Sequence, residues 1–357
     1  MKLSCLNRYL VFVSSFITLS TFSSVIYANG DYLIRQGLQE LVQRANFDKA
    51  EEFITRASKE HPNFKLAKFL EAELYTAMLG KEVAVREKSI AVDADSISYD
   101  LLEEAKLRTS APSNLSQLRP LQILKMPPNM DFMILVDASL HRAYVLKNQN
   151  GEPVWVHDFF ITLGKLGIGK QKEGDQKTPL GLYQVGDEVS KKNLTPFYGV
   201  GALKLNFPNS FDKYAERSGS GIWLHGVPQT TYNRPPKASD GCIVFSNEDL
   251  KQLIRIAQGA NINVLVSTSV KWLPRTDWQN RYKKVMDDMS DYLTMNPIIK
   301  NNKVLKKDLI AVYAPESETS VIVDRGLNNM KNYQRFREYW EKKGTTWQLK
   351  FESEFKS

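Results

Sequence analysis

The stretch that organises this chain covers residues 222–250 and reads IWLHGVPQTTYNRPPKASDGCIVFSNEDL. It contains His225, which Gly226 follows, and Cys242, which comes 17 residues after the histidine. A cysteine attacks carbonyl groups as the thiolate, and histidine is the usual base for its proton. The apolar residues before His225 predict a short strand, and Gly241 allows the backbone to approach a reacting group. We therefore predict a cysteine–histidine pair where strands give way to loops.

A second motif, GDQKTPLGLYQV, occupies residues 174–185 upstream of the first. A strand that ends in His-Gly, a loop of this length and the run Ser-x-Gly-Cys-Ile resemble the catalytic domain of the L,D-transpeptidase family, which has the YkuD-type fold. The upstream motif is similar to the other recurrent stretch of that family. The resemblance implies a mainly-β catalytic domain at residues 131–268. It is nearest to a subgroup that has helical repeats before this domain and a small nuclear-transport-factor-2-like domain after it.

The resemblance also implies roles for individual residues. Cys242 is the nucleophile, and His225 is its general base and later its general acid. The backbone carbonyl of Gly226 holds the second imidazole nitrogen. The backbone N–H groups of Gly241 and Cys242 form the oxyanion hole.

The substrate-binding residues are less closely matched to the family. Many members have a histidine where this chain has Asp240 and an arginine, thought to hold a substrate carboxylate, where it has Val244. Arg234 in the intervening loop either replaces that arginine as a carboxylate clamp or covers a surface. Ser239 and Asp240 shape the turn before the cysteine. Tyr232 either lines the cleft or belongs to the core.

The N-terminal residues 1–28 predict a signal peptide, with Lys2 and Arg8 around an apolar run and Ala28 before the cleavage point. An uncleaved anchor is the weaker alternative, because serine and threonine interrupt the run. Cleavage lowers the formal charge from +8 to +6 and leaves Cys242 as the one cysteine, so no disulfide framework is expected. We expect a periplasmic or cell-envelope protein with no membrane span after cleavage.

The composition also indicates what the protein does not bind. The basic residues form no stripe with interleaved aromatics, so we predict no nucleic-acid partner. His61, His141 and His157 have no metal-ligand spacing to another histidine, cysteine or carboxylate cluster, so we predict neither a metal nor a cofactor.

Periodicity outlines a multidomain chain. Residues 29–108 read as an α-helical region, either tetratricopeptide-like or a plain bundle, and four prolines make residues 109–130 a linker. Short strands and a helix at 247–258 fill the catalytic domain. Residues 270–357 read as a helix followed by four strands, a short α+β domain of the nuclear-transport-factor-2-like type.

These features lead to a functional hypothesis with alternatives. The leading interpretation is an exported L,D-transpeptidase that acts on peptidoglycan stem peptides through a Cys242 thioester, in cell-wall remodelling and cell shape. Water as the acceptor would instead make the protein an L,D-carboxypeptidase. A non-catalytic envelope module, which recruits a protein partner through the helical region, is an alternative of another class, and a cysteine peptidase acting on proteins is the least favoured.

Overall fold

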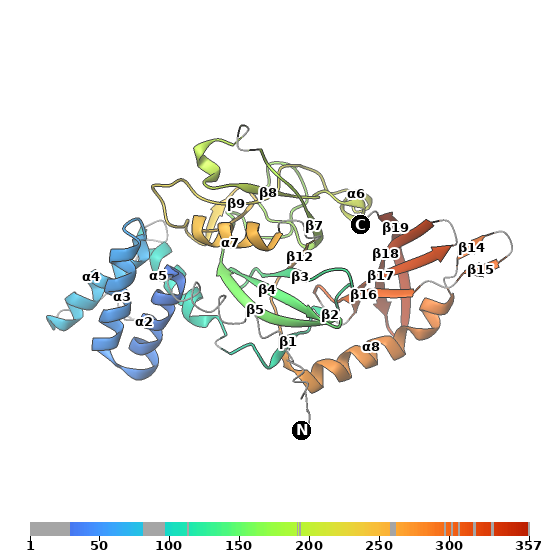
Figure 1. Cartoon of the computed structure of the whole chain (residues 1–357), viewed down its shortest axis with the longest axis horizontal. Helices are drawn as coiled ribbons and strands as arrows, with labels where there is room; N and C mark the ends of the chain where they lie inside the picture. The colour runs from blue at the N-terminus through green and yellow to red at the C-terminus, as the bar shows by residue number, and fades with distance from the viewer. Residues whose placement is uncertain are drawn as a thin grey trace, which may run out of the picture.

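The computed structural model describes the chain over residues 29–80, 97–112, 114–190, 192, 194–257, 262–295, 298–300, 303–305, 308–316, 319–329 and 332–355. The predicted signal peptide lies outside these residues. Figure 1 shows three units in a row, with helices at one end, a large sheet in the middle, and a second sheet with one long helix at the other end. The multidomain fold class expected from the sequence is confirmed.

Within the described residues 29–80 and 97–112, the N-terminal unit contains the helices α2 (Gly30–Arg44), α3 (Phe47–Glu60), α4 (Lys65–Met78) and α5 (Ile97–Ser110). Asn29 and Asn46 cap α2 and α3 by accepting backbone N–H groups of the first turns. Apolar residues at helical spacing on α2, α3 and α4 form one buried cluster. Gly37 lets α2 approach α3 closely, because a Cβ atom there would lie 2.7 Å from Cγ1 of Ile54.

The central unit is an eight-stranded sheet in the order β11-β9-β8-β7-β12-β3-β4-β5. Most neighbouring strands are antiparallel, but β12 runs parallel to β3 and β11 runs parallel to β9. Helix α7 (Asn247–Ala257) covers one face, and its apolar residues join the core of that face. The strands are β3 (Phe132–Asp137), β4 (Arg142–Gln149), β5 (Glu152–Phe160), β7 (Gly181–Glu188), β8 (Ala202–Leu205), β9 (Trp223–His225), β11 (Ile243–Val244) and β12 (Asn263–Ser267).

Short elements complete this unit. Strands β6 (Leu163–Gly164) and β10 (Lys237–Ser239) form a small parallel pair next to the large sheet. A 3-10 turn, η2 (Pro196–Tyr198), and helix α6 (Ser210–Tyr214) lie in the connections around β8.

The C-terminal unit packs the helix α8 (Arg275–Met295) on a five-stranded antiparallel sheet in the order β19-β18-β17-β16-β2. Its long strands are β16 (Asp308–Tyr313), β17 (Ser320–Asn329), β18 (Asn332–Lys343) and β19 (Thr346–Phe355), and a short hairpin joins β14 (Ile298–Lys300) to β15 (Lys303–Leu305). Four strands behind one helix agree with the sequence prediction. The helix begins later than the amphipathic pattern suggests, because β13 (Trp272–Pro274) precedes it.

The region predicted as a linker is partly ordered. β1 (Leu118–Pro120) pairs with β13, and β2 (Ile123–Lys125) pairs with β16 of the C-terminal sheet. Ile123 and Leu124 are fully buried there, which stabilises strands too short to be detected by alternation. Among the described helices, none has both the length and the apolar character needed to cross a membrane.

Candidate active site

The sheet edge formed by β9 and β11 brings the two predicted reactive residues together. β9 ends on His225, and β11 begins directly after Cys242. The strands run parallel, with Val244 beside His225. Cys242 is two residues before Val244, and alternate residues of a strand share a face, so this alternation places Cys242 on the same face as His225, two positions along the ladder.

The tautomer of His225 follows from its hydrogen bond. Nδ1 lies 2.7 Å from the carbonyl oxygen of Gly226. A carbonyl only accepts, so a neutral imidazole must carry its proton on Nδ1, which leaves the lone pair of Nε2 for a proton from another group. Burial lowers the pKa of His225 to about 4, against the opposing effect of the Gly226 carbonyl. The side chain is therefore neutral at pH 7 and able to act as a base.

The turn before Cys242 is fixed by its own side chains. The hydroxyl of Ser239 donates to the carbonyl of Cys242 at 2.7 Å and accepts the N–H of Gly241 at 3.1 Å. Gly241 has φ +123°, and a Cβ atom there would lie 2.7 Å from the carbonyl oxygen of Lys177. Only glycine fits this position, and its N–H is already engaged within the turn.

The thiol of Cys242 is protonated at rest. Its sulfur donates to the carbonyl of Gly221 at 3.3 Å, and an S–H group is needed to do so. Burial raises the pKa of the Cys242 thiol above its ordinary value, although the N–H of Trp223 and the charge of Arg234 act in the opposite direction.

The upstream motif supports this turn from the side. Thr178 accepts the N–H of Gly164 at 3.0 Å, and a Cβ atom on Gly164 would clash with the carbonyl oxygen of Gln176 at 2.4 Å. The same loop, through Gln176 and Lys165, donates to the exposed carboxylate of Asp240, and the Lys165 bond lowers the pKa of that carboxyl. The two sequence motifs thus form one structure around Cys242.

Asn247, the first residue of α7, holds the backbone on the other side of His225. Its Oδ1 accepts the N–H groups of Val200 (3.1 Å) and Val227 (3.2 Å), and its Nδ2 donates to the carbonyl of Val227 at 2.7 Å. A Cβ atom at Gly226 would lie 2.3 Å from this Oδ1, which explains the glycine after the histidine. The sequence places Asn247 only at the start of a predicted helix, because nothing local signals hydrogen bonds to two distant segments.

Comparison with known proteins identifies this part of the chain. Residues 131–272 match the family model of the L,D-transpeptidase catalytic domain, YkuD. This region belongs to that family. Comparison with curated proteins gives no match.

Two solved structures have a similar fold. Bd1075 of Bdellovibrio bacteriovorus is 22% identical with a TM-score of 0.53, and the alignment covers 66% of this chain and 98% of that chain. The helical cell shape determining protein Pgp2 of Campylobacter jejuni is 19% identical with a TM-score of 0.50, over 66% of this chain and 95% of that chain. At these identities the similarity concerns the fold.

Aromatic side chains and one cation surround the histidine of the L,D-transpeptidase domain. The ring of Tyr198 lies edge-on to His225 with centroids 5.0 Å apart, and the Phe197 ring lies 6.1 Å away. The guanidinium of Arg234 lies over Phe197, 4.1 Å from its centroid. Val244, which replaces the arginine of many family members, is buried and exchanges two backbone hydrogen bonds with Thr162.

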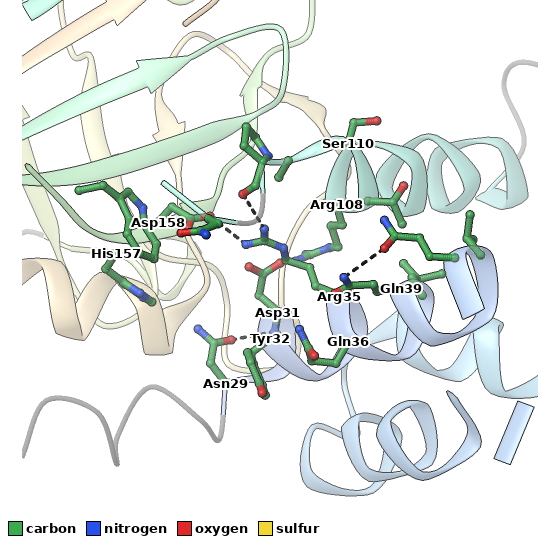
Figure 2. Close-up of a pocket in the computed structure, with 18 residues that line it drawn as sticks. Asn29, Asp31, Tyr32, Arg35, Gln36, Gln39, Arg108, Ser110, His157 and Asp158 are labelled. Atoms are coloured by element: carbon green, nitrogen blue, oxygen red, sulfur yellow. Dashed lines mark hydrogen bonds and ion pairs between the residues drawn. The ribbon is translucent and has the colours of Figure 1, made fainter. Parts of the chain in front are cut away.

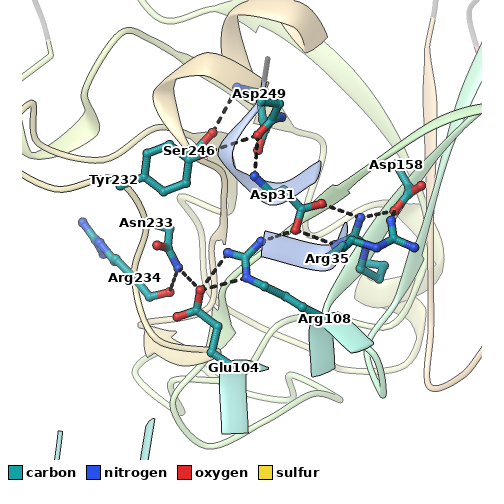
Figure 3. Close-up of polar contacts among 12 residues, drawn as sticks. Asp31, Arg35, Glu104, Arg108, Asp158, Tyr232, Asn233, Arg234, Ser246 and Asp249 are labelled. Atoms are coloured by element: carbon teal, nitrogen blue, oxygen red, sulfur yellow. Dashed lines mark hydrogen bonds and ion pairs between the residues drawn. The ribbon is translucent and has the colours of Figure 1, made fainter. Parts of the chain in front are cut away.

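Tyr232 is turned toward the helical unit. It is 9% exposed, stacks on Phe64 of the helical core at 4.2 Å, and donates its hydroxyl to Asn29 at 2.9 Å. Figure 3 shows Tyr232 and Asn233 beside the helices, whereas the Arg234 side chain extends away from them. We therefore assign Tyr232 to the interface between the units, since little of its ring remains for a substrate.

A network of buried charges fills the same interface. Asp31 of α2 pairs with Arg108 and Arg142, and Arg142 also pairs with Asp158. Arg108 lies between Asp31 and Glu104 of its own helix (Figure 3). Buried arginines with full sets of carboxylate partners fix the two units against each other, because removing either partner would leave an uncompensated charge.

A cavity of about 490 Å³ lies beside this network, and neither Cys242 nor His225 lines it. Its walls come from α2, the end of α5 and β5 (Figure 2). Arg35 crosses one wall and donates to Asp158 at 3.1 Å and to the carbonyl of Pro112 at 3.3 Å. The charges that line the cavity are thus already paired with protein groups.

Proposed function

We propose that the protein is an exported cysteine L,D-transpeptidase that acts on peptidoglycan stem peptides. The observation that carries the proposal is the arrangement at the β9–β11 edge. His225 presents a free Nε2 because Gly226 holds Nδ1, and Cys242 follows a glycine turn on the same face. The family match at residues 131–272 supports the substrate class.

The first half-reaction transfers an acyl group to sulfur. Nε2 of His225 accepts the thiol proton as Cys242 attacks the carbonyl of the diamino acid at the third stem position. The C–N bond to the terminal D-alanine breaks, and His225 returns the proton to the leaving amine. The N–H of Cys242 meets the oxyanion first, because the N–H of Gly241 must first leave Ser239.

The acceptor in the second half-reaction determines whether the enzyme is a transpeptidase or a carboxypeptidase. An amine from another stem peptide resolves the thioester into a cross-link, whereas water releases a tripeptide and makes the protein an L,D-carboxypeptidase. The buried Val244 supplies no cation for a stem-peptide carboxylate, which leaves Arg234 as the group proposed for that contact. Mass spectrometry of peptidoglycan incubated with the protein distinguishes the two, since cross-linking yields new dimers and hydrolysis yields tripeptides alone.

The proposal extends to the setting of the enzyme. Residues 1–28 would direct export to the periplasm, and the helical region would provide a surface for an envelope protein. A role in cell shape is proposed from the similar fold of the helical cell shape determining protein Pgp2.

Acylation by a carbapenem tests the nucleophile directly. We expect the intact mass of the wild-type protein to increase by one ring-opened carbapenem, and the mass of Cys242→Ala to stay unchanged. His225→Ala should form the same adduct more slowly, by a factor of about 100 or more. An unmodified wild-type protein, or an adduct that persists in Cys242→Ala, would remove Cys242 from the role of nucleophile and favour a non-catalytic module.

A further inference from the structure

The loop between β9 and β10, residues 226–236, begins directly after His225 and carries Arg234. We propose that the helical unit positions this loop, with Tyr232 as the anchor that places the Arg234 guanidinium beside Cys242. The inference rests on the proposed function in one respect, the use of Arg234 to bind a substrate carboxylate. It assigns to the helical unit a direct part in substrate recognition.

Arg234 lies within electrostatic reach of both reactive groups. Its positive charge lowers the pKa of His225 and, together with the Trp223 N–H, opposes the rise in the pKa of the Cys242 thiol that burial causes. In the described part of the chain it forms no salt bridge, and its Nη2 reaches the carbonyl of Phe197 at the long distance of 3.5 Å. The charge of Asp240 acts on Arg234 without forming a salt bridge with it. A partly exposed guanidinium that forms no salt bridge, near a nucleophile, is suited to bind the carboxylate of an incoming peptide.

The helical unit holds the first half of the loop. The side chain of Asn63 donates to the carbonyl of Gln229 at 3.3 Å, and the carbonyl of Asn63 accepts the N–H of Tyr232 at 3.4 Å. The Tyr232 ring is inserted into the buried helical cluster, where it stacks on Phe64 and donates to Asn29. The loop therefore lies on a preformed surface of the helices.

The second half of the loop is bound from both sides. Asn233 donates to Glu104 at 2.9 Å, and Lys237 pairs with Glu103 at 2.8 Å, so α5 contributes two contacts. On the catalytic side, Thr162 donates to the carbonyl of Arg234 at 3.0 Å. The backbone of Arg234 is thus held between the units while its side chain points to the active site.

The contacts with the helices must offset the conformational entropy that the loop at residues 226–236 loses when it is ordered. Ordering a loop costs about 1–2 kcal/mol per residue in backbone freedom, and this loop has no regular structure of its own. The contacts with the helices, above all the burial of the Tyr232 ring, offset that cost. Loss of the ring is expected to release the loop and to move the guanidinium away from the thiol.

The charge-selective alkylation of Cys242 measures the position of Arg234 without any substrate. Iodoacetate and iodoacetamide react with the same thiolate, but only iodoacetate carries a negative charge. The rate with iodoacetate divided by the rate with iodoacetamide therefore increases when a cation lies near the thiolate. We expect Arg234→Ala to lower this ratio by about three- to tenfold, as a single nearby charge would. Tyr232→Ala should lower it by a similar factor, and Tyr232→Phe, which keeps the stacked ring, should stay near the wild type. Peptide mass mapping assigns the reaction to Cys242.

Two controls separate positioning from general damage. Leu38→Ala removes a buried side chain of the same helical cluster without touching the loop, and it should leave the ratio unchanged. In the Arg234→Ala background, Tyr232→Ala should have no further effect, because the anchor acts through the guanidinium. An unchanged ratio in Tyr232→Ala, an equal fall in Leu38→Ala, or a further fall when Tyr232→Ala is added to Arg234→Ala would overturn the proposal.

The same variants connect the loop to catalysis. With stem peptides, Tyr232→Ala is expected to raise KM by about tenfold and to change kcat by less than about twofold, because it weakens substrate binding while Cys242 and His225 remain in place. A fall in kcat at constant KM would contradict a role in carboxylate binding. If the wild type shows no turnover and no carbapenem adduct, the proposed function fails, but the alkylation ratio still decides the positioning of Arg234.

Discussion

Replacing Asp249 by Asn is expected to stabilise the protein more at pH 8 than at pH 5. Asp249 lies in α7 at the interface with the helical unit, is 2% exposed, and accepts a hydrogen bond from the side chain of Asn29 at 2.5 Å. Burial raises the pKa of its carboxyl to about 7, and the negative charge of Asp31 adds to this rise, against the bonds from Ser246 and Asn29. The group is thus largely protonated in the folded state at pH 5 and about half protonated at pH 7.

The sign and the size follow from the difference between the folded and unfolded states. The pKa rises from 3.8 to about 7, so the folded state retains a proton that the unfolded state releases. The stabilising contribution is complete below pH 3.8 and disappears as the pH rises through 7. A difference of about 3 pKa units corresponds to roughly 4 kcal/mol in the free energy of unfolding. An asparagine resembles the protonated carboxyl and does not lose this contribution.

Urea denaturation of the wild type and Asp249→Asn at pH 5 and pH 8 measures the effect. Burial lowers the pKa of both His141 and His225 to about 4, so these groups make stability increase with pH between about 4 and 6.5. The histidines thus change stability with pH in the opposite direction to Asp249. Their effect is the same in the wild type and in Asp249→Asn, so it cancels in the difference between the two unfolding free energies. A difference in unfolding free energy that is equal at the two pH values would refute the assignment of a raised pKa to Asp249.

Three further predictions concern the site and the interface. The rate of Cys242 acylation should decline only below pH about 5, because the pKa of His225 is about 4, and a rate profile with an acid limb at 6.5 would contradict its burial. Gly241→Ala should slow acylation by tenfold or more, because an alanine there would introduce about 1–3 kcal/mol of backbone strain. Gly344 also has a positive φ but lies in open space, so Gly344→Ala should leave the acylation rate unchanged. The kinetics of adduct formation, followed by intact mass, compare the two variants. Asp31→Asn should lower the unfolding free energy by about 3–5 kcal/mol, measured in urea, since it removes one carboxylate partner from each of the buried Arg108 and Arg142; a loss below about 1 kcal/mol would indicate an interface open to water.

The catalytic fold could be predicted because its signals are local. The His-Gly and Ser-Asp-Gly-Cys segments each combine a short apolar strand with a turn that only glycine allows. At Gly241 the backbone has φ +123°, a conformation that favours glycine. The long alternating strands β17, β18 and β19 were detectable for the same reason, since their pattern extends over many residues. In these parts, local propensity and the final fold agree.

The remaining features depend on residues far apart in the sequence. β2 is three residues long and gains its order from β16, almost 190 positions away, so its own pattern carries no signal. Tyr232 reads as a cleft aromatic beside the motif, yet its partners Phe64 and Asn29 belong to the helical unit. Such contacts are invisible to periodicity because they depend on how separate units dock.

The environment of the reactive pair favours a neutral resting state over an ion pair. Burial raises the pKa of the Cys242 thiol above its ordinary value and lowers the pKa of the His225 imidazole to about 4, so proton transfer from the thiol to the imidazole is uphill in the resting state. The hydrogen bond from the thiol to Gly221 agrees with this state. Proton transfer therefore belongs to the step in which a bound carbonyl is attacked.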